Sequence, residues 1–425
     1  MNNKIIGCLL LMTTALNVVA QSGTSSPYSQ YGLGILTDPS QGGNRGMNGV
    51  GIGLRHGKQI NTLNPASYAV VDSMTMLFDM GLSGQLTHFK EGGTRVNAQN
   101  GNFEYAVGAF RATKGVGVSF GLLPLTNVGY DYTSSQTLTE FNTVIPTSYK
   151  GSGGLHQAFV GAGWQVLPHL SIGANVGYMW GTLTRSVTTT ATTTVNAIGK
   201  VYSATVANYK VDLGAQWEQP LNKQDVLSLG AIVGIGHHLN ADAGLTTQVG
   251  NGTPTVETIE NALALPMSYG VGLSFNHARS LTVALDGQYQ KWGALQFPQE
   301  NSQGQYVLTD GLLKDRVKVT AGVEWLPNPN QAIQSSSKLY RRIYYRAGLG
   351  YATPYYNING QSGPKEISAS VGLGIPMFGW MSRSFLNISG QWAHTAAPGL
   401  ITENIFRLNI GITFNERWFA KWKVE

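Results

Sequence analysis

Four cationic residues of this 425-residue chain lie in segments where apolar and polar residues alternate, and each could bind an anionic group. They are Lys210, Lys318, Arg346 and Arg407, and Tyr344 lies two residues before Arg346, on the same face. An amphiphile with a carboxylate needs an apolar cavity that ends in one or two cations, because an unpaired carboxylate is costly away from water. We therefore expect Arg346 and Lys318, on neighbouring segments, to hold such a head group.

The same cations have an alternative role as structural ion-pair partners. Asp212, Glu218 and Glu324 share their face of the alternation. Pairs between these carboxylates and the cations would stabilise a polar interior without binding any ligand. Removing the charges at positions 318 and 346 distinguishes the two roles, because uptake and ligand binding depend on these charges only in the first.

Other kinds of chemistry find little support in the residue pattern. His237 and His238 are neighbours, and adjacent strand residues point to opposite faces, so they cannot easily share a metal ion. Gly-x-Gly matches such as Gly161 to Gly163 lack a following helix, and no serine lies in a nucleophile-elbow setting. We therefore expect a protein that is not an enzyme and needs no metal or cofactor.

The first twenty residues have the form of a secretory signal peptide. Lys4 precedes an apolar run, and the small residues Val18 to Ala20 end it. We expect cleavage near Ala20. Cys8 is the only cysteine, so the mature chain would have neither a disulfide nor a thiolate.

The composition favours a membrane β-barrel. Charged residues make up only 12% of the chain, which also contains 54 Gly and 19 Tyr, whereas a soluble protein is about one quarter charged. Beyond the signal no run of eighteen apolar residues could form a transmembrane helix. The net charge of +6 is small for this length and does not indicate nucleic-acid binding. A secreted chain of this kind is typical of the outer membrane of Gram-negative cells.

Strict alternation of apolar and polar residues recurs along the chain, as a barrel with lipid outside and a lumen inside requires. Fourteen such segments predict fourteen antiparallel strands. They cover residues 74–89, 102–113, 115–132, 154–167, 169–186, 201–219, 225–240, 265–276, 280–292, 314–326, 340–352, 365–376, 384–394 and 404–414. Short connections alternate with long ones, and in such barrels the short turns are periplasmic.

Residues 21–72 lack this alternation, although they contain buried-type residues such as Val50, Ile52 and Tyr68. Pro65 excludes its surroundings from a sheet interior. A barrel of fourteen strands is wide enough to leave a lumen unless something fills it. We therefore predict an N-terminal hatch at residues 21–72 inside a barrel formed by residues 73–425.

The chain resembles the FadL-type outer-membrane transporters of long-chain fatty acids and other hydrophobic compounds. The resemblance lies in Asn64, Pro65 and Ala66, which follow the glycine-rich RGMNGVGIG and precede the first strand, SMTMLFDMGLSG. In that family the segment is a hatch inside a fourteen-strand barrel, and a kink in the third strand opens the wall sideways. Pro124 stands in the corresponding strand here. The helical loop insertion that helps characterised members bind ligand is not evident.

These observations predict a monomeric outer-membrane barrel that passes hydrophobic small molecules, such as fatty-acid-like amphiphiles, by passive diffusion. The hatch would move around Asn64 to Ala66, and the ligand would leave through the wall near Pro124. Membrane lipid and a hydrophobic ligand are the expected partners. Two alternatives stay open: a barrel scaffold that docks exported proteins for a secretion machinery, and a general pore for polar solutes.

Overall fold

The computed structural model describes residues 23–138, 143–191, 196–329, 338–377 and 384–416. The expected signal peptide and its cleavage site at Ala20 lie outside these residues. Within the described residues, no helix has the length and apolar character to cross a membrane.

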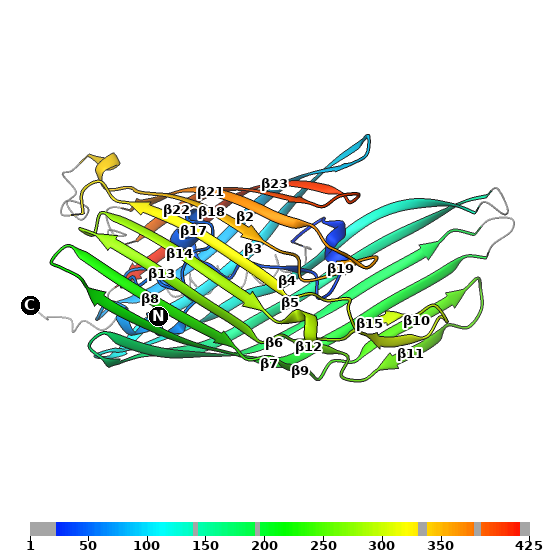
Figure 1. The fold of residues 1–425 in the computed structure, drawn as a ribbon, viewed down its shortest axis with the longest axis horizontal. Helices are drawn as coiled ribbons and strands as arrows, with labels where there is room; N and C mark the ends of the chain where they lie inside the picture. Colours follow the sequence, from blue (N-terminus) through cyan, green and yellow to red (C-terminus); the bar gives the residue numbers. More distant parts are fainter. Residues whose placement is uncertain (1–22, 139–142, 192–195, 330–337, 378–383, 417–425) are drawn as a thin grey trace, which may run out of the picture.

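Fourteen antiparallel strands form a closed barrel, as predicted (Figure 1). Each strand pairs with the next along the chain, and the last, β23, pairs with the first, β2, along fifteen residues from Met76–Glu416 to Lys90–Thr402. The strands are β2 (Met76–Glu91), β3 (Thr94–Thr113), β4 (Val116–Leu138), β5 (Thr143–Leu167), β6 (Leu170–Thr189), β7 (Ile198–Pro220), β8 (Asp225–Gly234), β13 (Ser268–His277), β14 (Leu281–Gln290), β17 (Arg316–Trp325), β18 (Tyr344–Ala352), β21 (Lys365–Pro376), β22 (Phe385–Ala396) and β23 (Thr402–Glu416).

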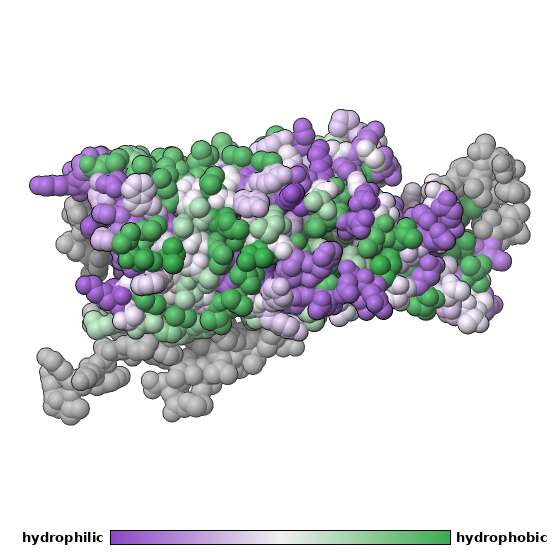
Figure 2. Space-filling view, turned by 60° about the horizontal axis from the view of Figure 1, so that its bottom comes forward, coloured by the Kyte–Doolittle hydropathy of each residue, from purple (hydrophilic) through white to green (hydrophobic). Residues whose placement is uncertain are grey.

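The two faces of the wall differ as the alternation requires. In β17, Val317 and Val319 are 40% and 41% exposed on the outside, whereas Thr320 and Glu324 on the inside are 2% and 4% exposed. Figure 2 shows hydrophobic side chains gathered over the middle of the wall, with hydrophilic ones on either side of them along the long axis. This distribution suits a wall that spans a membrane.

One half of the wall is much taller than the other. Strands β4 to β7 have 20 to 25 residues, whereas β8, β13, β14, β17 and β18 have 9 or 10. The tall half projects beyond the opposite rim, together with smaller strands (Figure 1). These are β9 (His237–Leu239), β10 (Ala243–Val249), β11 (Thr255–Ile259), β12 (Leu263–Leu265), β15 (Phe297–Glu300), β16 (Tyr306–Thr309), β19 (Asn357–Ile358) and β20 (Gln361–Ser362), with the short helix η3 (Trp292–Ala294). The short helix η4 (Leu339–Arg341) lies at the other end of the barrel (Figure 1).

The projection corrects two predicted loops. The sequence predicts loops at 133–153 and 187–200, yet much of both ranges continues the ladders β4–β5 and β6–β7. Threonine-rich stretches favour strands, and beyond the membrane both faces of a strand meet water. Their residues therefore need no apolar face, and the alternation that identified the other strands is weak there.

The strand predicted at 225–240 also ends earlier than expected. β8 stops at Gly234, opposite Ser268 of β13, and His237–Leu239 pair separately with β12. Pro266 precedes β13 and has no N–H to continue the ladder.

Residues 23–72, here called the N-terminal segment, lie within the barrel. The segment contains η1 (Pro27–Gln30), β1 (Ile35–Leu36), α2 (Gly42–Gly46) and η2 (Pro65–Val70). Helix α2 packs against β18, β21, β22, β23 and β2, and η2 packs against β3 to β7. The two helices therefore contact opposite parts of the wall.

Candidate functional site

Asn64, Pro65 and Ala66 fix the N-terminal segment to the wall. Asn64 is the N-cap of η2: its side-chain oxygen accepts a hydrogen bond from the backbone N–H of Ala66 at 3.1 Å. Pro65 occupies the first helical position, where a missing N–H costs nothing. The Asn64 amide also donates to the carbonyl oxygens of Ile52 and Ala215, at 2.9 and 3.1 Å. The motif therefore joins the segment to β7.

Glycines on the inner wall match the path of the segment. A Cβ on Gly173 would lie 2.4 Å from the carbonyl carbon of Pro65, and one on Gly230 would lie 2.0 Å from the carbonyl oxygen of Ile52. A Cβ on Gly372 would likewise lie 2.7 Å from the Cα of Gly46. Any side chain at these places would push the segment away from the wall.

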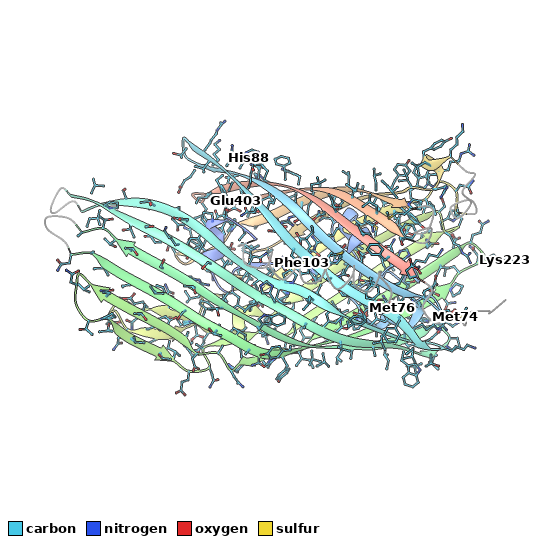
Figure 3. The ribbon with its side chains drawn as sticks, turned by 180° about the vertical axis from the view of Figure 1, so that it is seen from behind. Met74, Met76, His88, Phe103, Lys223 and Glu403 are labelled. Atoms are coloured by element: carbon cyan, nitrogen blue, oxygen red, sulfur yellow. The ribbon has the colours of Figure 1, made fainter. Side chains whose placement is uncertain are left out.

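The wall changes at Pro124, in the strand where the sequence predicts a kink. The register of β4 against β5 shifts between Pro124 and Thr126. Pairing between β3 and β4 ends just before this point, at Ala106 and Leu122. Beyond it, β3 pairs with β2 and β4 pairs with β5, and Figure 3 shows the two hairpins diverging toward their outer ends. In the described part of the chain, no ladder joins β3 to β4 past Leu122.

The start of the N-terminal segment occupies the break between β3 and β4. β1 pairs with β4 through Ile35–Asn127 and Leu36–Thr126. On the β3 side, the hydroxyl of Ser25 and the side chain of Asn100 are joined at 3.1 to 3.2 Å. Residues 23–37, here called the gate strip, therefore contact both edges of the break.

A cavity of about 360 Å³ lies behind the gate strip. Its lining includes both edges of the break, with Asn102 and Glu104 from β3 and Leu123 and Leu125 from β4. Aromatic side chains line it as well, among them Tyr28, Trp292, Tyr355 and Tyr356. The cavity thus has apolar surface, a few polar groups and a boundary at the break in the wall, which are features of small-molecule pockets.

Arg346 is engaged in a buried ion pair. Its Nε donates to the Glu324 carboxylate at 2.6 Å, and its Nη1 donates to Asn387 at 2.9 Å. The two charged side chains are 1% and 5% exposed. The ring of Tyr344 packs 5.2 Å from the guanidinium. A Cβ on Gly43 or Gly46 would lie 2.9 or 3.1 Å from atoms of Arg346, so the arginine lies against α2.

Lys318 forms an ion pair with Asp38, the residue that follows the gate strip. Its Nζ lies 3.0 Å from Oδ2 of Asp38. Burial raises the pKa of the Asp38 carboxyl, but Lys318 and Arg45 outweigh burial and hold that pKa below its ordinary value. In the β17–β18 ladder Lys318 is opposite Ala352, whereas Arg346 is opposite Glu324. Six residues of strand separate the two cations, about 20 Å, so one small head group cannot contact both.

The other two predicted cations line the cavity. Lys210 pairs with Asp212 two residues along its strand. Arg407 donates from Nη2 to Gln85 at 2.7 Å and from Nη1 to Gln391 at 3.2 Å. The structure therefore brings Lys210, Lys318 and Arg407 to the cavity and keeps Arg346 with Tyr344 apart from it.

Arg316 is a cavity residue that the sequence analysis missed. Its side chain lines the cavity and forms no hydrogen bond or ion pair with any residue that the structure describes. Glu366 and Asp38 act on its charge only from beyond ion-pair distance. The sequence could have identified Arg316, because it lies two residues before Lys318 and therefore faces the lumen as Lys318 does.

Comparisons with solved structures show the same fold. The chain matches the Ralstonia pickettii toluene transporter TbuX with a TM-score of 0.62 and 15% identity, covering 89% of this chain and 98% of that one. It matches the P. putida toluene transporter TodX with a TM-score of 0.62 and 16% identity, covering 90% and 100%. A Pseudomonas aeruginosa FadL homologue matches with a TM-score of 0.58 and 12% identity, covering 89% and 99%. The predicted resemblance to FadL-type barrels is confirmed.

A search of curated proteins gives no match. The model of one protein family, described as BamG, matches residues 1–425. The match extends over the whole chain. The chain is therefore a member of the BamG family.

Proposed function

We propose that the protein is an outer-membrane passive transporter of hydrophobic small molecules, in which residues 21–72 act as a hatch. The observation that carries the proposal is the cavity that ends at the break between β3 and β4. A ligand enters from the outer end, rests in the cavity and leaves sideways near Pro124. The gate strip has to move for this exit, because it occupies the break.

The likeness to the two toluene transporters and the FadL homologue supports this class of cargo. Arg316 extends the cargo to amphiphiles with an anionic head, such as fatty acids. It is a cavity cation without a direct partner among the described residues, and burying a carboxylate beside such a cation avoids the cost of leaving it unpaired. The cargo's apolar body would contact Leu123, Leu125 and the aromatic lining.

A reversible lock on the gate strip tests the proposal. Leu36 and Thr126 are direct partners in the β1–β4 pairing, and antiparallel partners lie within the Cα distance that a disulfide spans. We expect the double variant Leu36→Cys/Thr126→Cys to lose uptake of radiolabelled oleate when oxidised and to regain it on reduction. The assay uses Gram-negative cells that lack their own transporter for this compound.

The matched control places a disulfide in the projecting part. Gln299 and Val307 are partners in the β15–β16 pairing, so Gln299→Cys/Val307→Cys adds the same bond away from the gate strip. This variant should take up oleate equally in both redox states. Uptake through the Leu36/Thr126 lock that stays the same after oxidation would contradict a lateral exit.

A scaffold role is the second candidate. The observation that favours it is the projecting part, which carries exposed apolar side chains such as Val144 of β5 and Val256 of β11, 56% and 67% exposed. Exposed apolar residues on a rigid projection suit contact with another protein. Transport and docking use different parts of the molecule, so the two roles are compatible.

A further inference from the structure

We propose that the outer wall over β21, β22, β23, β2 and β3 binds one lipid with a phosphate head group from the surrounding leaflet. An acyl chain would occupy an apolar groove, and the phosphate would lie in the positive field of a row of three cations above it. The proposal rests on the membrane placement of the barrel but not on transport.

The groove has a volume of about 760 Å³ and a mostly apolar lining. Its sides are large outward-facing side chains that belong to four strands. They are Leu86 of β2, Phe406 and Leu408 of β23, Trp392 of β22 and Val371 of β21. A space of this size suits a small ligand or a lipid chain.

Two glycines, Gly84 and Gly390, line the groove on either side of Leu408. Gly101, Gly84, Leu408, Gly390 and Val371 follow one another in register across five strands. A Cβ on Gly84, Gly101 or Gly390 would meet no atom within 4 Å. These three glycines therefore leave a depression in the outer surface, between taller rows of side chains.

A polar row borders the groove on the side of the β2–β3 turn. His88 shares a hydrogen bond with Asn97 at 2.6 Å, and His394 shares one with Asn404 at 2.8 Å. The imidazole of His88 lies edge-on to Phe406, and that of His394 stacks on Trp392. Amphipathic rings of this kind belong where hydrocarbon gives way to head groups. In Figure 3, β2 runs from Met76, at the end where Lys223 lies, to His88 toward the opposite end.

Three cations form the next row outward. Lys90 pairs in register with Arg95 across the β2–β3 ladder, and Lys365 begins β21 opposite Ala396. All three have exposed side chains, and they share the strand parity of the outward-facing residues. Among the described residues none of the three forms an ion pair within 4.0 Å. About 13 Å of strand separates Lys90 from the Leu86 level of the groove.

The chemistry of the site favours a lipid over a protein strand. β2, β23 and β22, which lie under the groove, are each paired along both edges, so the groove itself offers no free edge to which another strand could add. Cations at the boundary of a membrane attract anionic head groups. An occupant with an apolar chain and a phosphate at one end matches both the groove and the row of cations.

The test counts lipids that stay on the purified, detergent-solubilised chain in native mass spectrometry. The probes are dioleoyl phosphatidic acid and, with the same chains, dioleoyl phosphatidylcholine. We expect the chain to retain one phosphatidic acid in preference to phosphatidylcholine. Lys90→Gln/Arg95→Gln/Lys365→Gln should weaken phosphatidic acid binding by about tenfold or more and leave phosphatidylcholine binding unchanged.

A second variant addresses the groove itself. Gly84→Leu/Gly390→Leu fills the groove and should weaken the binding of both lipids. Its control is Gly287→Leu, because a Cβ on Gly287 would make only an ordinary contact, 3.9 Å from Val271. The control for charge is Lys114→Gln/Lys223→Gln/Arg279→Gln, which removes three exposed cations at the end with short turns. Heat-dependent gel mobility checks that each variant has folded.

Equal retention of the two lipids by the unaltered chain would overturn the proposal. The proposal would also fail if the charge control lost as much phosphatidic acid binding as Lys90→Gln/Arg95→Gln/Lys365→Gln. A dimer that the groove variant abolishes would also overturn it, because the groove would then be a contact between two copies. Oleate uptake by Lys90→Gln/Arg95→Gln/Lys365→Gln should equal that of the unaltered chain. The lipid site and the transport function are therefore tested independently.

Discussion

Arg316, Lys318 and Arg346 show how neighbouring cations on one face acquire different roles. Lys318 and Arg346 pair with Asp38 and Glu324, which is the structural role that the sequence left open as an alternative. Arg316, at the start of the same strand as Lys318, lines the cavity without such a partner. Residue type and parity identified the lumen face, but partner choice depends on contacts between residues far apart in the chain.

Removing the charge of Arg316 should selectively weaken the binding of anionic cargo. In Arg316→Gln, decanoate should bind less tightly by about 1.5 to 3 kcal/mol, the usual worth of a hydrogen bond to a charged group, whereas decanol should bind as before. Titration calorimetry of the purified chain measures both. Lys223→Gln, at a short turn, is the control, and equal losses for decanoate and decanol would contradict a role for the charge.

The Asp38–Lys318 pair should hold the gate strip in a pH-dependent way. The folded pKa of Asp38 lies below its ordinary value of 3.8, so the pair's stabilisation is present above about pH 4 and is lost as the pH falls through the folded pKa. Asp38→Asn should remove it at neutral pH and increase protease cleavage within the N-terminal segment. Asp72→Asn, outside any ion pair that the structure describes, is the control. Equal cleavage in the two variants at pH 7 would contradict this role.

At the scale of elements, the N-terminal segment and the inner wall are shaped to one another. The alternation predicted all fourteen strands, because lipid and lumen impose opposite demands on successive residues. It could not show that the lumen glycines follow the path of the segment, since a glycine in a strand is equally suited to curvature or to a bulge. Only Pro124 indicated the break between β3 and β4. The alternation is read within one strand, whereas pairing depends on the residues of two.

A side chain at Gly173 should displace the segment and open the barrel. In Gly173→Ala the new Cβ would lie 2.4 Å from the carbonyl carbon of Pro65, an overpacking that typically costs about 1 to 3 kcal/mol. Liposome swelling should then show sucrose passage that the unaltered chain lacks. Gly287→Ala, whose Cβ would make only an ordinary contact with Val271, should stay closed to sucrose. Sucrose passage through the unaltered chain would instead support a general pore.

At the scale of the whole molecule, the tall half-wall separates a membrane part from a projecting part. The projecting part has its own hydrophobic cluster, which includes Val128, Leu155, Leu183 and Tyr306. The same cluster includes Tyr28 and Leu33 of the gate strip. The projection therefore packs directly on the residues that occupy the break.

Trimming the projection should distinguish docking from transport. The hairpin β10–β11 pairs with β7 but does not line the cavity. A variant in which a short Gly-Ser turn replaces residues 244–258 should fold and take up oleate normally. If the scaffold role holds, the same variant should lose any protein that copurifies with the unaltered chain under mild detergent. A loss of oleate uptake would show that the projection takes part in transport.

The hydrogen bond between Ser26 and Glu403 joins the first described turn to the last strand, 377 positions away. Contacts this distant in sequence are slow to form, because the intervening chain must be ordered first. Docking of β23 onto β2 completes the cylinder around residues that were synthesised at the very beginning. The Ser26–Glu403 hydrogen bond therefore forms only once β23 is in place, which makes it a late event in folding.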